Sequence, residues 1–391
     1  MRAAEFFQRF FRHTLWQVGF RSLFLLGFVA GAVLPLLWYA MYGSAPALHP
    51  NVTPLQWHVH EMLFGFGWAV LGGFLLTASK NWAGVRGFHG ASLFLVCVFW
   101  LLDRLAFWLP AGVPTSLLWV MHNAFLMLIV PMILWTLLTN LHKIAPDNGY
   151  FIIGLPIFLL GKNLLFTSEY FEVGWTLSLG LFRMAIAMML ERTLFQFMKL
   201  TYQIEIPQHR KLDALIRLGI FVAAFESLLP LSLAIAVLAL TATLLLVRFM
   251  LWSPRKGLSQ LDTGVSYVAY LSLVVSLYLE CLRLSGKLPV IGDVATHTFT
   301  LLSMGLLMAG MMVRISQGHT ARSVVFTATD KLAIWIAGLG GLARLLCPQL
   351  WPEQYGLFVL LAAAAWAICF GLLGWRLIPF LFKPRLDGKD G

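Results

Sequence analysis

The histidines are the residues of this sequence whose type and setting point most directly to chemistry. His58 and His60 stand in the segment Trp-His-Val-His-Glu-Met at 57–62, while His122 and His297 lie in two other long apolar segments. Polar side chains within membrane-spanning segments are energetically expensive and are candidates for a functional site by default. Because imidazole is a ligand that suits copper, iron and zinc, these four histidines predict a metal or heme site.

The segment 57–62 allows two arrangements of its histidines. On an ideal α-helix His58 and His60 point about 200° apart, whereas His58 and Glu61 share a face. If the chain is unwound after Pro54, both imidazoles can chelate one ion. If the segment is helical, the two histidines serve different partners, for example a heme iron and a second metal. In either case Glu61 is expected to accept a hydrogen bond that orients one of the rings.

The chain that must position these residues is far more apolar than a soluble protein. Of its 391 residues, 60% are hydrophobic and 12% are charged, and its mean hydropathy is +0.81. Soluble domains contain roughly 45–50% apolar and about 25% charged residues. The composition excludes a soluble enzyme, a disordered chain, a coiled coil and a disulfide-stapled secreted module. It predicts an all-α, polytopic integral membrane protein whose helices form one bundle.

Spanning helices, which need about 20 mostly apolar residues each, account for most of the chain. The fifth expected span is short and contains Pro156. The seventh and eighth meet at Pro230, where one long kinked element is the alternative. About twelve spans are predicted, at residues 20–42, 57–78, 90–109, 115–138, 149–166, 172–190, 212–229, 231–250, 264–283, 290–313, 330–348 and 353–378.

The basic residues are divided unequally between the two sides of this arrangement. With the N-terminus inside, 22 Lys and Arg fall on the inner side and 3 on the outer side, namely Lys162, Arg283 and Lys287. This bias follows the positive-inside rule and predicts that both termini are cytoplasmic. A single transmembrane domain, 1–391, is expected, with an interfacial amphipathic segment at 1–19, the helical bundle at 20–378 and a polar tail at 379–391.

Two other readings of the composition are rejected. The net charge of +11 does not indicate nucleic-acid binding, because the basic residues are scattered between apolar blocks. The four cysteines lack the C-x-x-C spacing of zinc or iron–sulfur sites.

The predicted orientation places the four histidines at one depth. His58, His60, His122 and His297 all fall in the outer third of the membrane, whereas His319 lies just after the tenth span on the inner side. Charged residues from several spans share the outer layer: Asp103, Arg104, Glu226, Glu280, Arg283 and Arg344.

Heme fits this outer layer better than a bare ion. A b-type heme needs one or two histidine ligands and an apolar slot, and its two propionates need cations, which Arg104, Arg283 and Arg344 can supply. The alternative for these arginines is pairing with Asp103, Glu226 or Glu280 as structural ion pairs. Covalent c-type attachment is excluded because the sequence contains no C-x-x-C-H.

Two parts of the sequence resemble signatures of a known family. The segment Trp-His-Val-His-Glu-Met-Leu-Phe-Gly-Phe at 57–66, with its continuation through 73–78 to Asn81-Trp82, is similar to the opening signature of the NnrS family. His297, Gly305 and the segment Met-Met-Val-Arg-Ile-Ser-Gln-Gly-His-Thr at 311–320 are similar to the second signature. The order of the signatures and the twelve-span frame also match, so the resemblance covers most of the chain.

The resemblance implies a bacterial inner-membrane protein of nitric oxide metabolism or nitrosative-stress defence that binds heme b and copper. Nitric oxide is then the expected ligand, within a lipid bilayer and with an unidentified redox partner. The predicted metal ligands are His58, His60 and His297, supported by Glu61. The full set of predicted cofactor-binding residues is His58, His60, His122, His297, His319, Arg104, Arg283, Arg314 and Arg344.

The sequence departs from the family pattern in two places. Where members carry a Gly-Arg-x-x-Pro-Phe-like stretch, this chain reads Glu191-Arg192-Thr-Leu-Phe-Gln196, and Ala321 stands where glycine is usual. These departures point to a divergent subgroup.

Three classes of function remain open at this stage. A heme- and copper-binding protein that binds or turns over nitric oxide is the leading hypothesis, and no catalytic residue is assigned. The alternatives are a membrane transporter and an assembly factor for another metalloenzyme. Twelve spans and a charge within the membrane at Arg183 favour the transporter. His58, His60 and His297 are expected to govern cofactor occupancy in the outer layer, while His319, on the predicted cytoplasmic side, is not.

Overall fold

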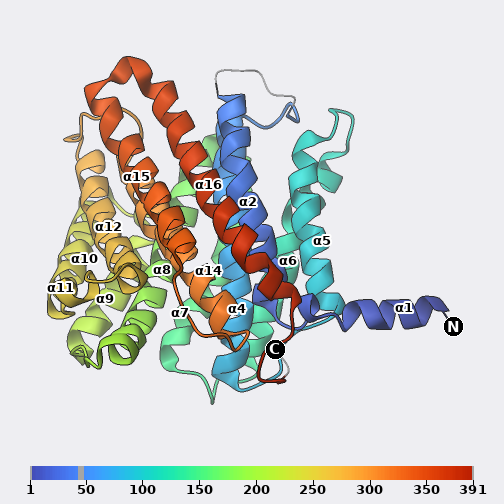
Figure 1. Cartoon of the computed structure of the whole chain (residues 1–391). Coiled ribbons are helices and arrows are strands. Elements are labelled where there is room, and N and C mark those ends of the chain that lie inside the picture. The colour runs from blue at the N-terminus through green and yellow to red at the C-terminus, as the bar shows by residue number, and fades with distance from the viewer. Residues whose placement is uncertain (1, 43–47, 390–391) are drawn as a thin grey trace. The chain divides into compact units, whose positions relative to one another are not determined.

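The fold is helical throughout the part of the chain that is described. The structure, a computed structural model, describes residues 2–42 and 48–389, with the backbone alone for residues 2–4 and 6. Every regular element in these residues is a helix (Figure 1), and each predicted span coincides with one. Ten of these described helices are long and apolar enough to cross a membrane. The all-α, multi-pass membrane class is therefore confirmed.

Two of the predicted spans form helices that are too short to count among these ten. α7 (Gly149–Leu164) has 16 residues and α9 (Arg210–Ala223) has 14, fewer than the about 20 that a full crossing needs. The chain does break before Pro230, which caps the N-terminus of α10 (Leu231–Leu251). The count of twelve and the cytoplasmic placement of the termini stay predictions.

The chain forms two compact units that alternate along the sequence. Unit 1 comprises Met1–Phe171, Met312–Val325 and Phe370–Gly391. The prediction of a single domain is not tested by this division, and residues 1, 390 and 391 of its terminal segments lie outside the described residues. The elements of the first part of unit 1 are α1 (Arg2–Phe11), η1 (Thr14–Trp16), α2 (Gly19–Met41), α3 (Pro54–His60), η2 (Glu61–Gly67), α4 (Trp68–Ala83), α5 (Ala91–Leu105), η3 (Ala106–Trp108), α6 (Thr115–Leu138), η4 (Pro146–Asn148), α7 and η5 (Ser168–Tyr170).

Unit 2 comprises Glu172–Met311 and Phe326–Cys369. α14 and α16 each begin in unit 2 and end in unit 1. The elements from α8 onward are α8 (Phe171–Tyr202), α9, η6 (Glu226–Leu228), α10, α11 (Pro254–Gly257), α12 (Leu261–Leu284), α13 (Val294–His297), η7 (Thr298–Gly305), α14 (Leu306–Gly318), α15 (Ala328–Leu350), η8 (Pro352–Gln354) and α16 (Tyr355–Phe382).

The helix α3–η2–α4 is the most buried span of unit 1, because glycines let its neighbours approach. A Cβ atom added at Gly73 would lie 3.0 Å from Cβ of Leu23 on α2, and one at Gly72 would lie 2.7 Å from Cδ1 of Ile129 on α6. Small residues at such positions allow close helix packing within a membrane. This packing fixes the position of α3 and η2 along their axis relative to α2 and α6. These two elements carry the first family signature.

Both signature segments contain a π-helical turn in the same relation to a histidine. His60 ends α3 and is followed directly by the π-helical η2, and His297 ends α13 and is followed directly by the π-helical η7. π-helical turns are rare and occur frequently at functional sites. The two segments that the sequence singles out therefore share an unusual backbone feature.

The first and the last membrane-spanning helices of the chain contact each other in unit 1. Nη1 of Arg21, near the start of α2, donates to the carbonyl oxygens of Leu381 (2.9 Å) and Lys383 (2.8 Å) at the end of α16. A guanidinium at a helix C-terminus satisfies carbonyls that have no partner within the helix. The start of α2 and the end of α16 therefore lie at the same end of unit 1.

One departure from the family pattern has a conformational consequence. Ala321 adopts a positive φ of 58°, in the turn that follows α14. A Cβ atom makes this left-handed conformation unfavourable, and glycine adopts it freely. The glycine that the family usually has at this position is the residue that the turn favours.

We therefore expect Ala321→Gly to stabilise the protein by about 0.5–1 kcal/mol, because the relief of left-handed strain exceeds the extra chain entropy of glycine. The same substitution at the exposed Ala236, inside α10, should destabilise it by up to about 1 kcal/mol. Thermal unfolding of the purified variants measures both changes, and a decrease in stability for Ala321→Gly would refute the strain argument.

Candidate metal centre

The first signature begins as a regular, well-capped helix. The Thr53 hydroxyl accepts from the Gln56 backbone N–H at 3.2 Å, the Gln56 side chain accepts from the Thr53 backbone N–H at 2.8 Å, and Pro54 occupies the first helical turn. This reciprocal pair is a capping box, and proline is favoured at a helix start. The chain after Pro54 is therefore helical, and the unwound alternative for the two histidines is wrong.

His58 and His60 accordingly contact different residues. The His58 ring stacks on Trp38 of α2, with ring centroids 4.1 Å apart, and is half-buried. His60 is fully buried and faces Asp103 of α5 and His122 of α6. One ion bound by both His58 and His60, as one reading of the sequence allowed, is not supported by this arrangement.

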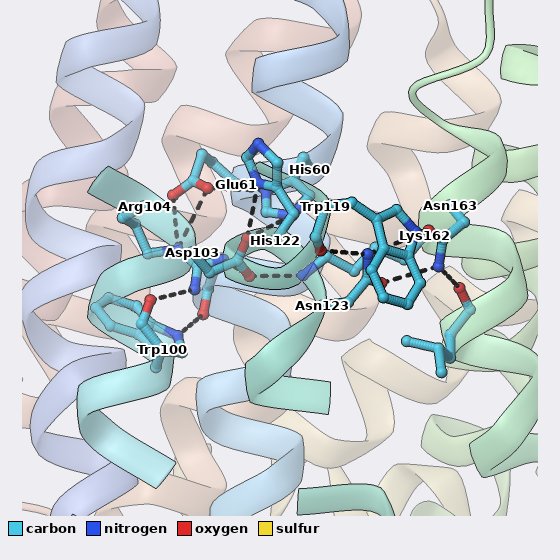
Figure 2. Close-up of polar contacts among 12 residues, drawn as sticks. His60, Glu61, Trp100, Asp103, Arg104, Trp119, His122, Asn123, Lys162 and Asn163 are labelled. Atoms are coloured by element: carbon cyan, nitrogen blue, oxygen red, sulfur yellow. Dashed lines mark hydrogen bonds and ion pairs between the residues drawn. The ribbon is translucent and has the colours of Figure 1, made fainter. Parts of the chain in front are cut away.

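Asp103 connects two histidines that lie 62 residues apart in the sequence. Its Oδ1 atom lies 3.4 Å from Nε2 of His60 and 3.1 Å from Nδ1 of His122 (Figure 2). Donor atoms of these three side chains all lie within 4.8 Å of one another, and all three residues are buried. Two imidazoles and one carboxylate form a donor set that suits iron, copper or zinc.

The alternating direction of successive helices produces this convergence. Asp103 lies in the last turn of α5, and His122 lies in the second turn of α6. Lys162 lies in the last turn of α7, and His60 lies near the start of the α3–η2–α4 span. Consecutive antiparallel helices place the end of one beside the beginning of the next, so all four side chains lie at one end of unit 1.

The two oxygens of Asp103 have different neighbours. While Oδ1 faces the imidazoles, Oδ2 lies 2.6 Å from Nζ of Lys162 and 3.2 Å from Nη2 of Arg104. Asp103 and Lys162 are fully buried. Because an unpaired charge buried in a low-dielectric interior is strongly destabilising, the two cations at Oδ2 balance the charge of Asp103, while Oδ1 contacts the two imidazoles.

Glu61 holds the His60 ring in a fixed orientation. Its Oε1 atom accepts a hydrogen bond of 2.8 Å from Nδ1 of His60, and its carboxylate pairs with Nε of Arg104 at 3.1–3.2 Å (Figure 2). Histidines that bind metals commonly donate their second ring N–H to a carboxylate in this way. The predicted contact between Glu61 and a histidine ring is present, on His60, and its role toward a metal stays a prediction.

Gly65 provides the space for this pair of charges. A Cβ atom at position 65 would lie 2.9 Å from Oε2 of Glu61 and 3.5 Å from Nε of Arg104. The Gly65 carbonyl accepts a hydrogen bond of 3.0 Å from the Trp100 indole, and the Arg104 guanidinium stacks on that indole at 4.5 Å. The glycine of the first signature therefore belongs to the site.

The two ring nitrogens of His60 face different carboxylates, Nδ1 that of Glu61 and Nε2 that of Asp103. With Nδ1–H donating to Glu61, Nε2 of a neutral ring carries a lone pair, and that atom has no hydrogen-bond partner in the described chain. It lies 3.4 Å from Oδ1 of Asp103, which is also an electron-pair donor. Two acceptors face each other stably only with a cation between them, either a proton or a metal ion.

The surroundings of His60 suit an ion rather than a macrocycle. The rings of Phe107, Phe166 and Phe64 lie 4.8, 5.5 and 5.5 Å from the His60 ring, centroid to centroid. A heme iron on Nε2 would place a wide porphyrin plane where Asp103 now lies at 3.4 Å. The His60 site therefore fits a bare metal ion and does not fit heme in this packing.

The predicted residues of unit 2 belong to a separate polar cluster. Nη1 and Nη2 of Arg183 lie 3.0 Å from Glu226 and 3.4 Å from Glu280, and Glu280 also pairs with Arg283 at 2.6 Å. Arg344 hydrogen-bonds to the Tyr355 hydroxyl and stacks on its ring. His297 bonds through Nδ1 to the carbonyl oxygen of Asp293 at 2.7 Å.

These contacts bear on the predicted role of the arginines. Arg104 and Arg283 pair with carboxylates, as the structural alternative for these residues proposed, and Arg344 binds a tyrosine. Their role with heme propionates stays a prediction. Because His297 belongs to the other unit, its participation with His60 in one site also stays a prediction.

The residues of the second signature from Met312 onward lie in unit 1. Arg314 is half-buried on α14, and His319 follows the end of that helix, with its ring 5.6 Å from Phe20. His319 lies near the start of α2, whereas the His60 cluster lies near the start of α3. The two ends of unit 1 thus carry different sets of polar residues.

Asp103 and Lys162 are the site residues that the sequence did not assign. The sequence indicated Asp103 only as a partner for arginine, and Lys162 only entered the charge count. Their depths, near the ends of the third and fifth spans and level with His60 and His122, are the signal that could have identified them.

The match to a family model covers the whole of this site. The model of the NnrS protein family matches residues 14–385, which include every helix from η1 to α16 and both signature segments. A comparison with curated proteins finds no match. The resemblance seen in the two signatures thus extends over nearly the whole sequence, and this chain belongs to the NnrS family.

Proposed function

We propose that this membrane protein binds a redox-active metal ion at His60, Asp103 and His122 and binds nitric oxide at that ion. The observation that carries the proposal is the convergence of three buried donor groups: Nε2 of His60 and Nδ1 of His122 lie 3.4 and 3.1 Å from Oδ1 of Asp103. The family to which the chain belongs supports the assignment to nitric oxide.

The residues around the donors have defined tasks in this proposal. Glu61 orients the His60 ring, while Lys162 and Arg104 neutralise the carboxylates. Phe64, Phe107 and Phe166 exclude water. When bound, a redox-active ion would supply an open coordination position and a means of electron transfer to nitric oxide.

The burial of the site suits nitric oxide as the ligand. His60 and Asp103 are each 0% exposed, so a hydrated or charged substrate would have to lose its water to reach them. Nitric oxide is small, uncharged and soluble in the bilayer, so it can reach a metal inside a helical bundle without an aqueous channel.

Copper and heme b enter the proposal at separate places. Copper or non-heme iron is assigned to the His60 cluster, on the periplasmic side according to the distribution of Lys and Arg. Heme b is assigned to His58 or His297. The bond between Nδ1 of His297 and the Asp293 carbonyl leaves Nε2 of His297 as the ligating atom.

The metal assignment predicts that His60→Ala and His122→Ala lose the bare metal ion. Each substitution removes one of three protein donors, so the affinity should fall more than the 10–100-fold that is typical of losing a supporting residue. Iron and copper content of the purified variants is the measurement. His89→Ala is the matched control, because His89 is exposed and bonds to the Gly87 carbonyl oxygen.

A wild-type protein without metal, after expression with ample iron and copper, would contradict the proposal. In that case His60 is an imidazolium between Glu61 and Asp103, and the cluster is a structural ion-pair network. Equal metal content in His60→Ala and His89→Ala would lead to the same conclusion.

Glu61→Gln is expected to weaken the metal site without removing a ligand. Loss of the charge that supports the His60 ring should lower the metal affinity by about 10–100-fold, and it should decrease the spectral change that nitric oxide produces in the metal-loaded protein. Glu205→Gln is the control, since Glu205 pairs with Lys199 at the surface. If nitric oxide leaves the optical and EPR spectra of metal-loaded wild type unchanged, its assignment as the ligand is wrong.

The heme assignment predicts a separate pattern. A Soret band should appear in wild type made with ample heme and persist in His60→Ala and His319→Ala. It should be lost in His58→Ala or His297→Ala. Absence of the band from wild type excludes heme, and its loss in His319→Ala with full retention in His297→Ala would overturn the placement of heme on the outer side.

A further inference from the structure

A second group of polar residues lies at the end of unit 1 where α2 begins and α16 ends. It is built from Arg21 of α2, His319 and Arg322 from the turn after α14, and Arg385 from the C-terminal segment. These residues come from three distant parts of the chain, and the proposed metal site uses none of them. The second family signature ends in this group.

One nitrogen of the Arg21 guanidinium, Nη1, has hydrogen-bond partners in the described residues, whereas Nε and Nη2 have none. Nη1 donates to the carbonyls of Phe380, Leu381 and Lys383 at 2.8–3.2 Å. Nε and Nη2 are buried and have no hydrogen-bond partner within residues 2–42 and 48–389. The whole side chain is 0% exposed. Buried donors are almost always satisfied, so two of them on one side chain indicate a missing partner.

The arrangement of these two donors specifies the chemistry of that partner. The N–H groups on Nε and Nη2 point the same way and form the fork with which arginine binds two oxygens of one carboxylate or phosphate. Capping of the α16 C-terminus satisfies the donors on Nη1, but it does not satisfy those on Nε and Nη2. The missing partner is therefore an oxyanion rather than a single carbonyl.

The charges that act on Arg21 are those of cations, one of which, Arg385, is itself paired with Asp387 at 2.7 Å. Arg322 and Arg385 are the charges that act most strongly on Arg21, and those that act on His319 are Lys80, Arg385 and Arg21. Burial first, and then these three cations, lower the pKa of His319 to about 4. The ring is neutral near pH 7, and a bound anion would offset the repulsion among the surrounding cations.

The backbone holds the outer cations in place. Nη1 of Arg385 donates to the His319 carbonyl at 3.1 Å, and the Leu386 N–H donates to the Thr320 carbonyl at 3.2 Å. The Arg322 guanidinium lies over the Phe380 ring at 4.7 Å. Nε and Nη2 of Arg385 pair with the Asp387 carboxylate at 2.7–2.9 Å, which partly neutralises this cation. Arg322 and Arg385 are half-buried, so they can form the rim of a site whose deepest donor is Arg21.

The position of the group relates it to the membrane surface. Arg21 is the third residue of the span Gly19–Met41, and His319 directly follows the span Val294–Gly318. Arg385 lies three residues beyond the span Pro352–Phe382. Ends of spans lie at the level of lipid headgroups, and basic pockets between helices on the cytoplasmic side bind anionic headgroups.

We propose that Arg21, with Arg322 and Arg385 at the rim, binds a phosphate group at this end of unit 1. The phosphate belongs either to an anionic phospholipid or to free inorganic phosphate, and both sources present the paired oxygens that the Arg21 fork requires. The site is independent of the metal site, so it stands or falls separately.

The test uses the full chain in two arms. In the first, delipidated protein in a zwitterionic detergent is titrated with inorganic phosphate in a calorimeter. In the second, protein purified from phosphatidylcholine nanodiscs with and without cardiolipin is analysed by native mass spectrometry for retained lipid. The variants are Arg322→Gln and Arg385→Gln, which change the rim and leave the buried Arg21 in place. Arg255→Gln, an exposed charge in α11 of unit 2, is the matched control.

Each rim variant should weaken binding about fivefold, equivalent to ~1 kcal/mol, and Arg255→Gln should bind like wild type. Phosphate binding in the first arm identifies free phosphate as the source. Cardiolipin retention that is lost in the rim variants, without phosphate binding, identifies a lipid. Absence of binding in both arms, or equal binding by wild type and both rim variants, overturns the proposal. Unchanged metal content and gel-filtration profile show that the variants are folded.

Discussion

A carboxylate inside a membrane-spanning bundle is stable only when partners held at fixed positions balance its charge. Asp103 meets this condition through the adjacent Arg104 and through side chains from three other helices: Lys162 lies with Arg104 at Oδ2, and the two imidazoles lie at Oδ1. Four elements must therefore keep their relative heights, because a shift of one turn, about 5.4 Å, would leave a buried charge without its partner. The rigidity that the ion pairs impose on unit 1 is what a metal site needs, since ligands must be held close to their final geometry before the ion arrives.

Much of the fold follows from the lengths of apolar runs, whereas the composition of the site depends on which helices are neighbours. The span ranges and the break before Pro230 could be predicted because hydrophobic length and proline act locally. The placement of His60 and His122 at the same end of their helices could also be predicted, and the two rings do lie together. The selection of Asp103 as their common partner could not, because it requires knowing that α3, α5 and α6 pack together. The apolar runs at 149–166 and 212–229 predicted spans there, yet the helices that form, α7 and α9, end after 16 and 14 residues.

The π-helical turns show a second limit of sequence reasoning. Ideal α-helical spacing places Glu61 on the same face as His58, but the π-helical turn starts at Glu61, and its carboxylate bonds to the adjacent His60. A local change of helical period alters which side chains meet without changing the hydrophobic pattern. Since a similar turn follows His297, both signatures combine a histidine with a backbone that departs from α-helical geometry. The shared feature favours a functional role for His297 as well, although its neighbours in unit 2 differ from those of His60.

Buried polar atoms at the two ends of unit 1 call for ligands of opposite charge. Around Asp103, cations and carboxylates are paired within the protein. Nε2 of His60, which has no hydrogen-bond partner in the described part of the chain, lies 3.4 Å from a carboxylate oxygen of Asp103, and a cation would satisfy both atoms. Around Arg21, the charges that act most strongly are those of Arg322 and Arg385, the second of which is paired with Asp387. Nε and Nη2 of Arg21 have no hydrogen-bond partner among the described residues, which calls for an anion. The same rule, that buried polar atoms require partners, thus predicts ligands of opposite charge at the two ends. The residue types of the two segments agree with this difference. The turn after α14 carries basic residues and a neutral histidine, which suit an anion, whereas the first signature carries histidines and a glutamate, which suit a cation.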